Sequence, residues 1–440
     1  MPDYDLVVIG GGPAGMMAAA RAGERGRRVL LLERGPSLGR KLLITAGGRC
    51  NVTNSAPLPE FLKAFGRQGG FLRDAMTRFG NAELLEWLHN SGVRTVEERK
   101  GRVFPESQQA MTILEALRAY LQAGGVEIRF NQRVESLWIE QGKLLGVRSA
   151  ECRVRSEPPE ASSSFRTPHS ALESAAVLIA TGGLSYPATG CTGDGYALAR
   201  QAGHSIVAPY PAIVAFETAE SWPKNIQGTP IKNVSVIARH EGKKLAENFG
   251  EALWTHYGIS GPAILDISGA VVLALRKGGA VALELDLRPA DTEESLDERL
   301  LHAIKKEGKK QISTVLGGWI AERTAAQLLQ LAEVDPRKKM SQCSKSDRKR
   351  IVRLVKHLEL RVRGHRPIEE AIVTGGGVPL SEVDPKRMES RLLKNLHFAG
   401  EVLDLAGPSG GYNLQAAFST GYLVGESVGR ENCCKIHSNS

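Results

Sequence analysis

The chain has 440 residues and a formal net charge of +9, with 24% charged and 42% hydrophobic residues. This length allows two or three domains, and no stretch approaches the ~20 apolar residues that a membrane-spanning helix requires. The N-terminal residues lack the basic start of a signal peptide, so we expect a cytoplasmic protein that does not associate with membranes.

The first motif is a glycine-rich turn that follows a short apolar run, residues 6–9. Gly10, Gly12 and Gly15 have the G-x-G-x-x-G spacing, and an alanine-rich helix is expected after them. The first glycine permits a tight turn, the second lets the backbone approach a pyrophosphate, and the third lets the helix pack on the strand. Glu33 ends the next apolar run, where its carboxylate can accept a ribose hydroxyl. The stretch predicts a dinucleotide-binding Rossmann fold.

A polar, glycine-rich loop follows at residues 39–54. Lys41 and Arg49 offer positive charge to a phosphate, and Cys50 and Asn51 come directly after the arginine. The loop is long enough to wrap an extended ligand. We therefore predict that it contacts the cofactor; the alternative is a surface loop without function.

Further along, we expect three more strands of the same domain, at residues 126–130, 133–137 and 175–183. The second strand would bring backbone to an adenine ring, which makes Val134 a candidate contact. The third strand ends in Thr181 and Gly182, and it leads to a turn-rich loop where Asp194 is placed to cap a helix.

Residues 151–175 interrupt this pattern with a segment that is rich in proline and serine and poor in apolar side chains. Such a composition cannot bury enough apolar surface to fold. We expect a disordered insertion inside a hairpin, with no functional role.

The pattern changes at about residue 204, where short alternating runs separated by Gly, Pro and Asn suggest an antiparallel sheet or small barrel. Within this region His256 and Tyr257 precede a predicted helix that has Pro262 in its first turn. Their rings are candidates to face a ligand. A packed loop with satisfied polar groups is the alternative for both.

A basic helical segment at residues 293–358 is predicted next. Residues 301–366 hold 17 Lys and Arg against six Asp and Glu, a local excess of +11. Clustered cations suit contacts with phosphates, although a solvated helix face has the same composition. The candidates for RNA contact are Lys338, Lys339, Arg348, Lys349 and Arg350.

The chain then returns to the first domain. A strand near residues 396–398 delivers Gly400 and Glu401, and a glycine-rich segment enters a final helix at Tyr412, Asn413 and Leu414. A helix N-terminus stabilises negative charge on the pyrimidine end of a reduced flavin. Cofactor segments this far apart in the sequence suit FAD better than a free nicotinamide coenzyme.

The six cysteines show no C-x-x-C pair and no spacing typical of metal ligands. The pattern favours a reducing cytoplasm without structural disulfides, and it predicts no metal site. The cysteines are Cys50, Cys152, Cys191, Cys343, Cys433 and Cys434.

Together, these motifs resemble the YhiN/BaiN family of FAD-containing flavoproteins, related in fold to the glutathione-reductase-type flavoproteins. The resemblance covers nearly the whole chain. It implies an α/β fold: a discontinuous Rossmann-like FAD domain (1–203 and 371–430), an inserted antiparallel β-barrel (204–292 and 359–370), a helical insert (293–358) and a tail (431–440). By motif position it implies FAD contacts at Ala14, Glu33, Arg34, Lys41, Arg49, Cys50, Asn51, Val134, Glu401, Asn413 and Leu414.

Two positions depart from the family pattern. Ala46 stands where a glycine is usual, and Cys191 where a serine is more frequent. The first substitution would stiffen the loop. The second argues against treating residue 191 as a required nucleophile.

Three functions are compatible with these features. The first is an FAD-dependent reductase, with NAD(P)H as a transient electron donor, that converts uridine to dihydrouridine in large-subunit ribosomal RNA. It requires hydride at C6 and a proton at C5, and Cys50 is the proton donor to test first, although a packing role suits it as well. The second is a small-molecule enzyme, either an enoyl or steroid-type reductase or an amine oxidase. The third is a non-catalytic redox scaffold. The oligomeric state is left open.

Overall fold

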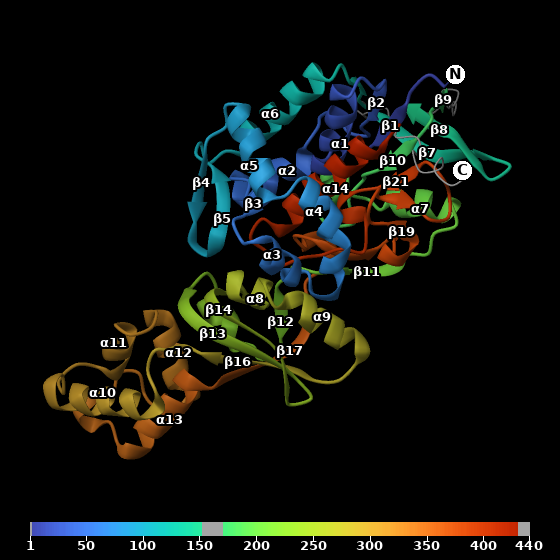
Figure 1. Ribbon diagram of the computed structural model, residues 1–440. Coiled ribbons are helices and arrows are strands. Elements are labelled where there is room, and N and C mark those ends of the chain that lie inside the picture. The colour runs from blue at the N-terminus through green and yellow to red at the C-terminus, as the bar shows by residue number, and fades with distance from the viewer. Residues whose placement is uncertain (1, 152–169, 430–440) are drawn as a thin grey trace, which may run out of the picture. The chain divides into compact units, whose positions relative to one another are not determined.

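The computed structural model describes residues 2–151 and 170–429 (Figure 1). The chain forms two compact units, Met1–Tyr210 with Val373–Ser440, and Pro211–Ile372. Most of the predicted disordered insertion, and the tail with Cys433 and Cys434, lie outside the described residues. The finer domain boundaries stay predictions.

The first unit is built on a seven-stranded sheet. In sheet order its strands are β19 (Val383–Asp384), β20 (Glu389–Ser390), β21 (Leu396–Phe398), β10 (Val177–Ile179), β1 (Leu6–Ile9), β2 (Val29–Leu32) and β6 (Glu127–Arg129). The last five are parallel, and the first two form an antiparallel edge. Every residue of β1, β2 and β10 is buried, which is why these strands read as unbroken apolar runs.

Two helices pack closely against each other in this unit. Helix α1 (Pro13–Glu24) follows the glycine turn, and α14 (Tyr412–Ser427) lies against it. A Cβ atom at Gly421 would lie 2.2 Å from the carbonyl oxygen of Ala14. Small residues on both helices therefore set their close approach, and α14 joins the C-terminal segment to the start of the chain.

The remaining elements surround this sheet and helix pair. The helices are α2 (Arg40–Ile44), α3 (Leu58–Ala64), α4 (Arg73–Arg78), α5 (Asn81–Asn90), α6 (Ala110–Ala123) and α7 (Asp194–Gln201). There are also three small sheets. One consists of β3 (Thr53–Asn54), β5 (Arg102–Pro105) and β4 (Thr95–Glu98), and another of β7 (Gln132–Glu140), β8 (Lys143–Glu151) and β9 (Ser170–Glu173). The third pairs β11 (Val207–Pro211) with β18 (Thr374–Gly377).

The second unit contains a closed barrel. Around the barrel its strands are β12 (Phe216–Thr218), β15 (Gly258–Ser260), β14 (Lys243–Trp254), β13 (Pro230–His240), β16 (Val281–Asp286) and β17 (Leu358–His365). Buried residues alternate with more exposed ones along β16 and β17, as expected for one face turned to a core. Helices α8 (Pro262–Leu265) and α9 (Ser268–Lys277) pack on β14.

Four helices lie between β16 and β17 in the sequence: α10 (Glu293–Lys306), α11 (Ile312–Gly317), α12 (Glu322–Leu331) and α13 (Lys345–Lys356). Helix α13 packs against α10 and α12. Its start is fixed by a capping box, in which the Ser344 hydroxyl accepts from the Asp347 amide and the Asp347 carboxylate accepts from the Ser344 amide.

The α/β fold class with a Rossmann-type sheet and a barrel is confirmed. Among the described residues, no helix has both the length and the apolar content to cross a bilayer.

Candidate functional site

The predicted cofactor residues of the first unit gather where four parallel strands end. The glycine turn follows β1 and Glu33 follows β2. Thr181 and Gly182 come two and three residues after β10, and Gly400 comes two residues after β21. In open α/β sheets, ligands bind outside the carboxyl ends of the strands. Segments that are hundreds of residues apart in the sequence thus share one edge.

The three glycines of the turn have different surroundings. A Cβ at Gly10, where φ is +107°, would lie 2.6 Å from the Ala180 carbonyl oxygen, and a Cβ at Gly15 would lie 2.0 Å from the Gly10 carbonyl oxygen. A Cβ at Gly12 would have nothing within 4 Å. Packing therefore requires glycine at the first and third positions, whereas the second position faces open space.

Glu33 closes the turn from the second strand. Its carboxylate accepts hydrogen bonds from the Gly11 amide at 2.8 Å and the Gly35 amide at 2.6 Å. A carboxylate has about four acceptor positions, so two remain for hydroxyl groups of a ligand. This arrangement suits recognition of a ribose.

A largely buried ion pair joins helix α2 to the segment after β21. Lys41 Nζ lies 2.7 Å from Glu401 Oε2 and donates to Ser185 Oγ at 2.6 Å; Ser185 Oγ donates to Glu401 Oε1 at 3.0 Å. The Thr374 amide donates to the same carboxylate at 2.6 Å. About one-fifth of each charged side chain is exposed. Sequence analysis had missed Ser185 and Thr374.

The two charges stabilise each other. Burial alone would lower the pKa of Lys41, but the Glu401 carboxylate outweighs it and raises that pKa. Burial alone would raise the pKa of Glu401, but Lys41, Ser185 and Thr374 outweigh it and lower that pKa. Both groups therefore stay charged across the neutral range, in a place that is largely shielded from water.

Two buried polar atoms of the predicted cofactor residues have no hydrogen-bond partner within the part of the chain that the structure describes. They are Asn51 Oδ1 and Thr181 Oγ1. Buried polar groups are nearly always satisfied, so each calls for a partner. Together with the open space at Gly12 and the free acceptor positions of Glu33, they fit a polar, dinucleotide-sized cofactor.

Arg34 and Val134 lie beside a second ion-pair cluster. Arg34 donates to Thr192 Oγ1 at 2.5 Å and to Asp194 Oδ2 at 3.0 Å, and Arg133 pairs with Asp194 at 2.9 Å. Asp194 is the first residue of α7, whose N-cap is Gly193 and not Asp194. The predicted capping role is therefore wrong, because both carboxylate oxygens face arginines. A cavity of about 180 Å³ lies next to Asp194 and Val134.

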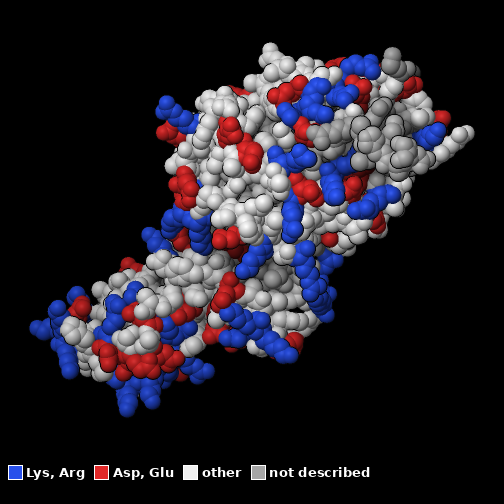
Figure 2. Space-filling model, in the orientation of Figure 1, with Lys and Arg blue, Asp and Glu red and all other residues white. Residues whose placement is uncertain are grey.

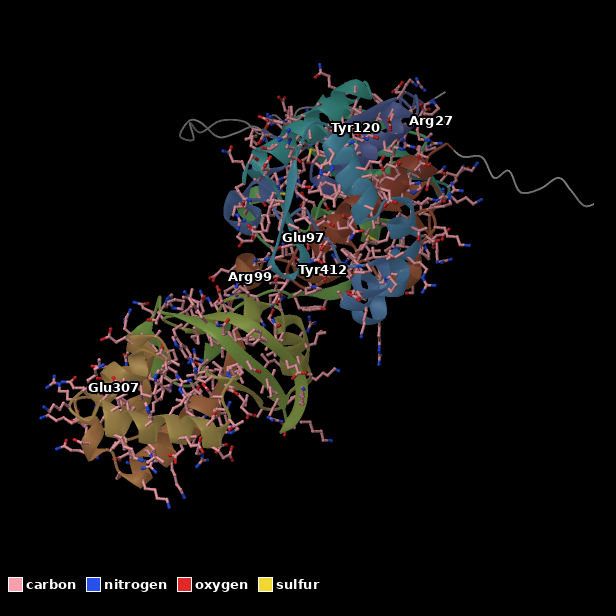
Figure 3. All side chains as sticks on the ribbon, turned by 60° about the vertical axis from the view of Figure 1, so that its left-hand side comes forward. Arg27, Glu97, Arg99, Tyr120, Glu307 and Tyr412 are labelled. Carbon is pink, nitrogen blue, oxygen red and sulfur yellow. The ribbon has the colours of Figure 1, made fainter. Side chains whose placement is uncertain are left out.

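Several other cofactor candidates already contact protein groups. Arg49 donates to Glu98 and to Gln108, and its guanidinium lies 4.1 Å from the centre of the Phe104 ring. Asn413 bonds to the Gly407 amide at 2.8 Å and so holds the glycine-rich loop before α14. Tyr412, labelled in Figure 3, packs 4.7 Å from the Phe61 ring. Their roles in binding FAD stay predictions, as do those of Leu414 and Ala14.

The catalytic candidates lie in different units. Cys50 is fully buried, and burial raises the pKa of its thiol to about 12, which favours the packing role. His256 and Tyr257 lie between β14 and β15, with their rings 4.8 Å apart and the Arg366 guanidinium 4.7 Å from the Tyr257 ring centre. Cys191 is also buried, and burial raises its pKa. All catalytic assignments stay predictions.

Ala46 adopts a left-handed conformation, with φ +50° and ψ +38°. A side chain costs about 1–2 kcal/mol there, and glycine loses about 0.4–1 kcal/mol more chain entropy on folding. We therefore expect Ala46→Gly to raise the free energy of unfolding by up to about 1 kcal/mol. Urea unfolding of the flavin-free protein measures this; a lower stability would contradict the strain assigned to Ala46.

Three of the five predicted RNA contacts form ion pairs inside the helical segment. Lys338 Nζ lies 2.7 Å and Arg350 Nη2 3.0 Å from the Asp347 carboxylate, and Arg348 Nε lies 2.8 Å from Asp297. Burial alone would raise the pKa of Asp347. Hydrogen bonds outweigh burial and lower this pKa to about 2, and the largest of these contributions comes from Lys338. These three cations hold the helices together. Lys339 and Lys349 are exposed, with no ion pair among the described residues.

The fold and the strand-end site define a dinucleotide-binding protein of the Rossmann type. The HI0933-like protein Rossmann domain matches residues 4–427, so the chain belongs to the HI0933-like family, and the resemblance read from the sequence is confirmed. The protein is an FAD-dependent oxidoreductase.

Relatives that match nearly the whole chain carry two different names. The chain is 30% identical to the 3-dehydro-bile acid delta(4,6)-reductase of Clostridium scindens, over 96% of this chain and 98% of the relative. It is 29% identical to the ribosomal RNA dihydrouridine synthase of Escherichia coli, over 97% and 98%. The fold is similar to that of 3-ketosteroid delta1-dehydrogenase from Sterolibacterium denitrificans, with a TM-score of 0.55, 14% identity, and coverage of 97% and 99%.

Proposed function

We propose that this protein reduces the carbon–carbon double bond of a uridine in large-subunit ribosomal RNA, giving dihydrouridine, with NAD(P)H as transient electron donor. When bound, FAD supplies the hydride. The chain would hold FAD with the glycine turn, Glu33, Asn51, Thr181 and the Lys41–Glu401 pair. A proton must also reach the neighbouring carbon, and Cys50, His256 and Tyr257 are the residues to test for that step.

The observation that carries the RNA substrate is a row of unpaired cations on α13. Lys345, Lys349 and Arg353 are exposed and four residues apart, so they share one helix face with about 6 Å between successive positions. None of the three has an ion pair among the described residues. Asp347, Ile351 and Val355 form the opposite, buried face.

Other exposed cations lie elsewhere on the helical segment. Lys305, Lys306, Lys309, Arg337 and Lys339 are exposed on the same helical segment. Figure 2 shows Lys and Arg gathered around the edge of these helices, with an acidic band across the face turned to the viewer. Clustered exposed cations suit a linear polyanion better than a small substrate.

The test is the triple variant Lys345→Ala/Lys349→Ala/Arg353→Ala, in which the ion pairs that hold the helices are intact. Each lost contact with single-stranded RNA makes the slope of log affinity against log salt shallower by about 0.7. We expect the slope of RNA binding to fall by about 2, with the flavin spectrum and uridine-free flavin reduction unchanged.

The matched control is Arg118→Ala/Lys143→Ala/Arg200→Ala, which removes three exposed cations of the first unit that have no ion pair within residues 2–151 and 170–429. Both triple variants lose three positive charges. If the RNA contact is specific to the α13 face, the control should have the same salt slope as the wild type. Equal slopes for both triple variants would rule out the α13 face as the RNA contact.

A second candidate is a small-molecule reductase, favoured by the 30% identity to the bile acid reductase. It also adds hydride to a carbon–carbon double bond. Under this alternative the reduction rate of an unsaturated 3-keto steroid would be high, independent of salt, and unaffected by the α13 triple variant.

A further inference from the structure

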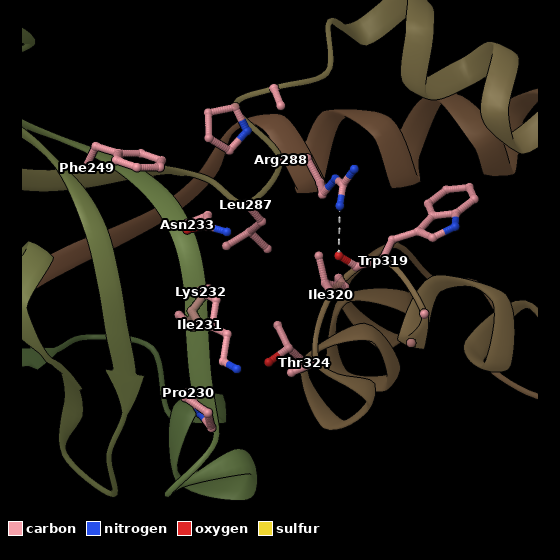
Figure 4. A pocket seen from close by; sticks show the side chains of 15 residues that line it. Pro230, Ile231, Lys232, Asn233, Phe249, Leu287, Arg288, Trp319, Ile320 and Thr324 are labelled. Carbon is pink, nitrogen blue, oxygen red and sulfur yellow. Dashed lines mark hydrogen bonds between the residues drawn. The ribbon is translucent and has the colours of Figure 1, made fainter. Parts of the chain in front are cut away.

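A cavity of about 740 Å³ lies within the second unit, outside the residues assigned to FAD (Figure 4). One wall is the start of β13 with Phe249 of β14. The other walls are the segment after β16 and the turn between α11 and α12. Its size falls in the ~300–1,000 Å³ range of ligand pockets.

The β13 wall contains a bulge. The pairing of β13 with β14 shifts between Ile231 and Val234, and Asn233 has φ +54°. Neighbouring side chains of a regular strand point to opposite faces, but a bulge re-aims them. Figure 4 shows the nitrogens of Lys232 and Asn233 on the same side of the strand, pointing into the space opposite Ile320 and Thr324.

These two polar groups are available to a ligand. Lys232 and Asn233 are exposed, and in the described parts of the chain neither side chain has a hydrogen bond or ion pair. None of the described residues that line the cavity carries a carboxylate. The bulge therefore presents one cation and one amide, a donor and acceptor together, without a competing acid.

The opposite wall is fixed and the floor is apolar. Arg288 donates to the Trp319 carbonyl oxygen at 3.1 Å and to Asp291 at 2.8 Å, so it braces the turn. Leu287 is 2% exposed, whereas the Phe249 ring is 50% exposed at the rim. The cavity thus combines an apolar interior with an aromatic residue at its rim.

We propose that this cavity binds an unpaired nucleotide of the RNA substrate. The base stacks on Phe249 over the apolar floor, the Asn233 amide bonds to the base edge, and the Lys232 ammonium contacts a phosphate. Proteins read single-stranded RNA in this way, with aromatic stacking and hydrogen bonds to the edges of splayed bases. The assignment rests on the RNA function proposed above.

A steroid carboxylate fits the cavity less well. It would use the apolar floor and Lys232, but not an amide that both donates and accepts. The row of cations on α13 belongs to the same unit and would serve the phosphates of a longer strand. RNA recognition requires contacts to a base and contacts to the phosphate backbone. The cavity would provide the first and the α13 face the second.

The experiment measures binding of a fluorescent oligouridylate to the FAD-loaded protein across a range of salt concentrations. We expect Lys232→Ala to weaken binding and make the salt slope shallower by about 0.7. Asn233→Gly, which keeps the left-handed backbone, and Phe249→Leu should each weaken binding about tenfold without changing the slope. The control Lys243→Ala, on an exposed lysine of β14 away from the cavity, should change neither.

The outcomes separate this site from the function on which it rests. If the cavity variants bind like the wild type while the α13 triple variant does not, the RNA function stands and the cavity assignment is wrong. If the wild-type protein binds no oligouridylate, both fail. If cholate binds and the cavity variants lose cholate but not RNA, the cavity belongs to a small anion and the proposal is overturned.

Discussion

Gly15→Ala is expected to prevent the first unit from folding normally, whereas Gly12→Ala should fold and lose FAD. A Cβ at residue 15 would lie 2.0 Å from the Gly10 carbonyl oxygen, a contact with backbone that cannot rotate away. We expect a loss of about 3 kcal/mol or more in the free energy of unfolding.

Gly12→Ala is the matched control, because its Cβ meets no protein atom within 4 Å. The flavin-free variant should unfold like the wild type. Overpacking against a bound ligand costs ~1–3 kcal/mol, so FAD affinity should fall about 10- to 100-fold. Urea unfolding and a flavin titration measure the two effects. Normal FAD affinity in Gly12→Ala would show that the cofactor does not approach the turn.

Lys41→Met is expected to cost about 3–5 kcal/mol in stability and to lower the flavin content of the purified protein. The change leaves the Glu401 carboxylate buried without its cation. The double variant Lys41→Met/Glu401→Gln should recover part of the loss, because it removes the orphaned charge as well. A double variant whose stability loss equals the sum of the single losses would contradict the pairing.

The pH dependence gives an independent check on Lys41→Met. In the wild type, the raised pKa of Lys41 contributes stability that is lost as pH rises above about 10. The lowered pKa of Glu401 contributes stability that is lost as pH falls below about 4. In the variant, burial acts on Glu401 without Lys41 and raises its pKa. Stability should therefore increase as pH falls from 8 to 5, a slope that the wild type lacks.

The fold was readable from the sequence where local geometry sets the residue type. Gly10 and Gly15 carry contacts that no side chain permits, and β1, β2 and β10 are apolar because both faces are buried. Each of these constraints sets the residue types of a short stretch of chain. The same is true of the alternating pattern in β16 and β17.

The polar contacts of the site were not readable in this way. Ser185, in the loop after β10, and Thr374, the first residue of β18, are 189 residues apart and meet only in the folded chain. Likewise, Arg348 and Asp297 are 51 residues apart, so the charge pattern of α13 alone could not distinguish cations in ion pairs from free ones. The sequence located the basic segment. The ion pairs of Lys338, Arg348 and Arg350 leave Lys345, Lys349 and Arg353 as the cations to test for the proposed RNA contact.

The proposed reaction is tested most directly by nucleoside mass spectrometry of large-subunit ribosomal RNA incubated with the FAD-loaded protein and NADPH or NADH. RNA made by transcription in vitro supplies a substrate free of modification. We predict that one uridine gains two hydrogen atoms, and that the α13 triple variant produces much less product at moderate salt. An RNA that stays unmodified, while the same preparation reduces an unsaturated 3-keto steroid, would contradict the proposal.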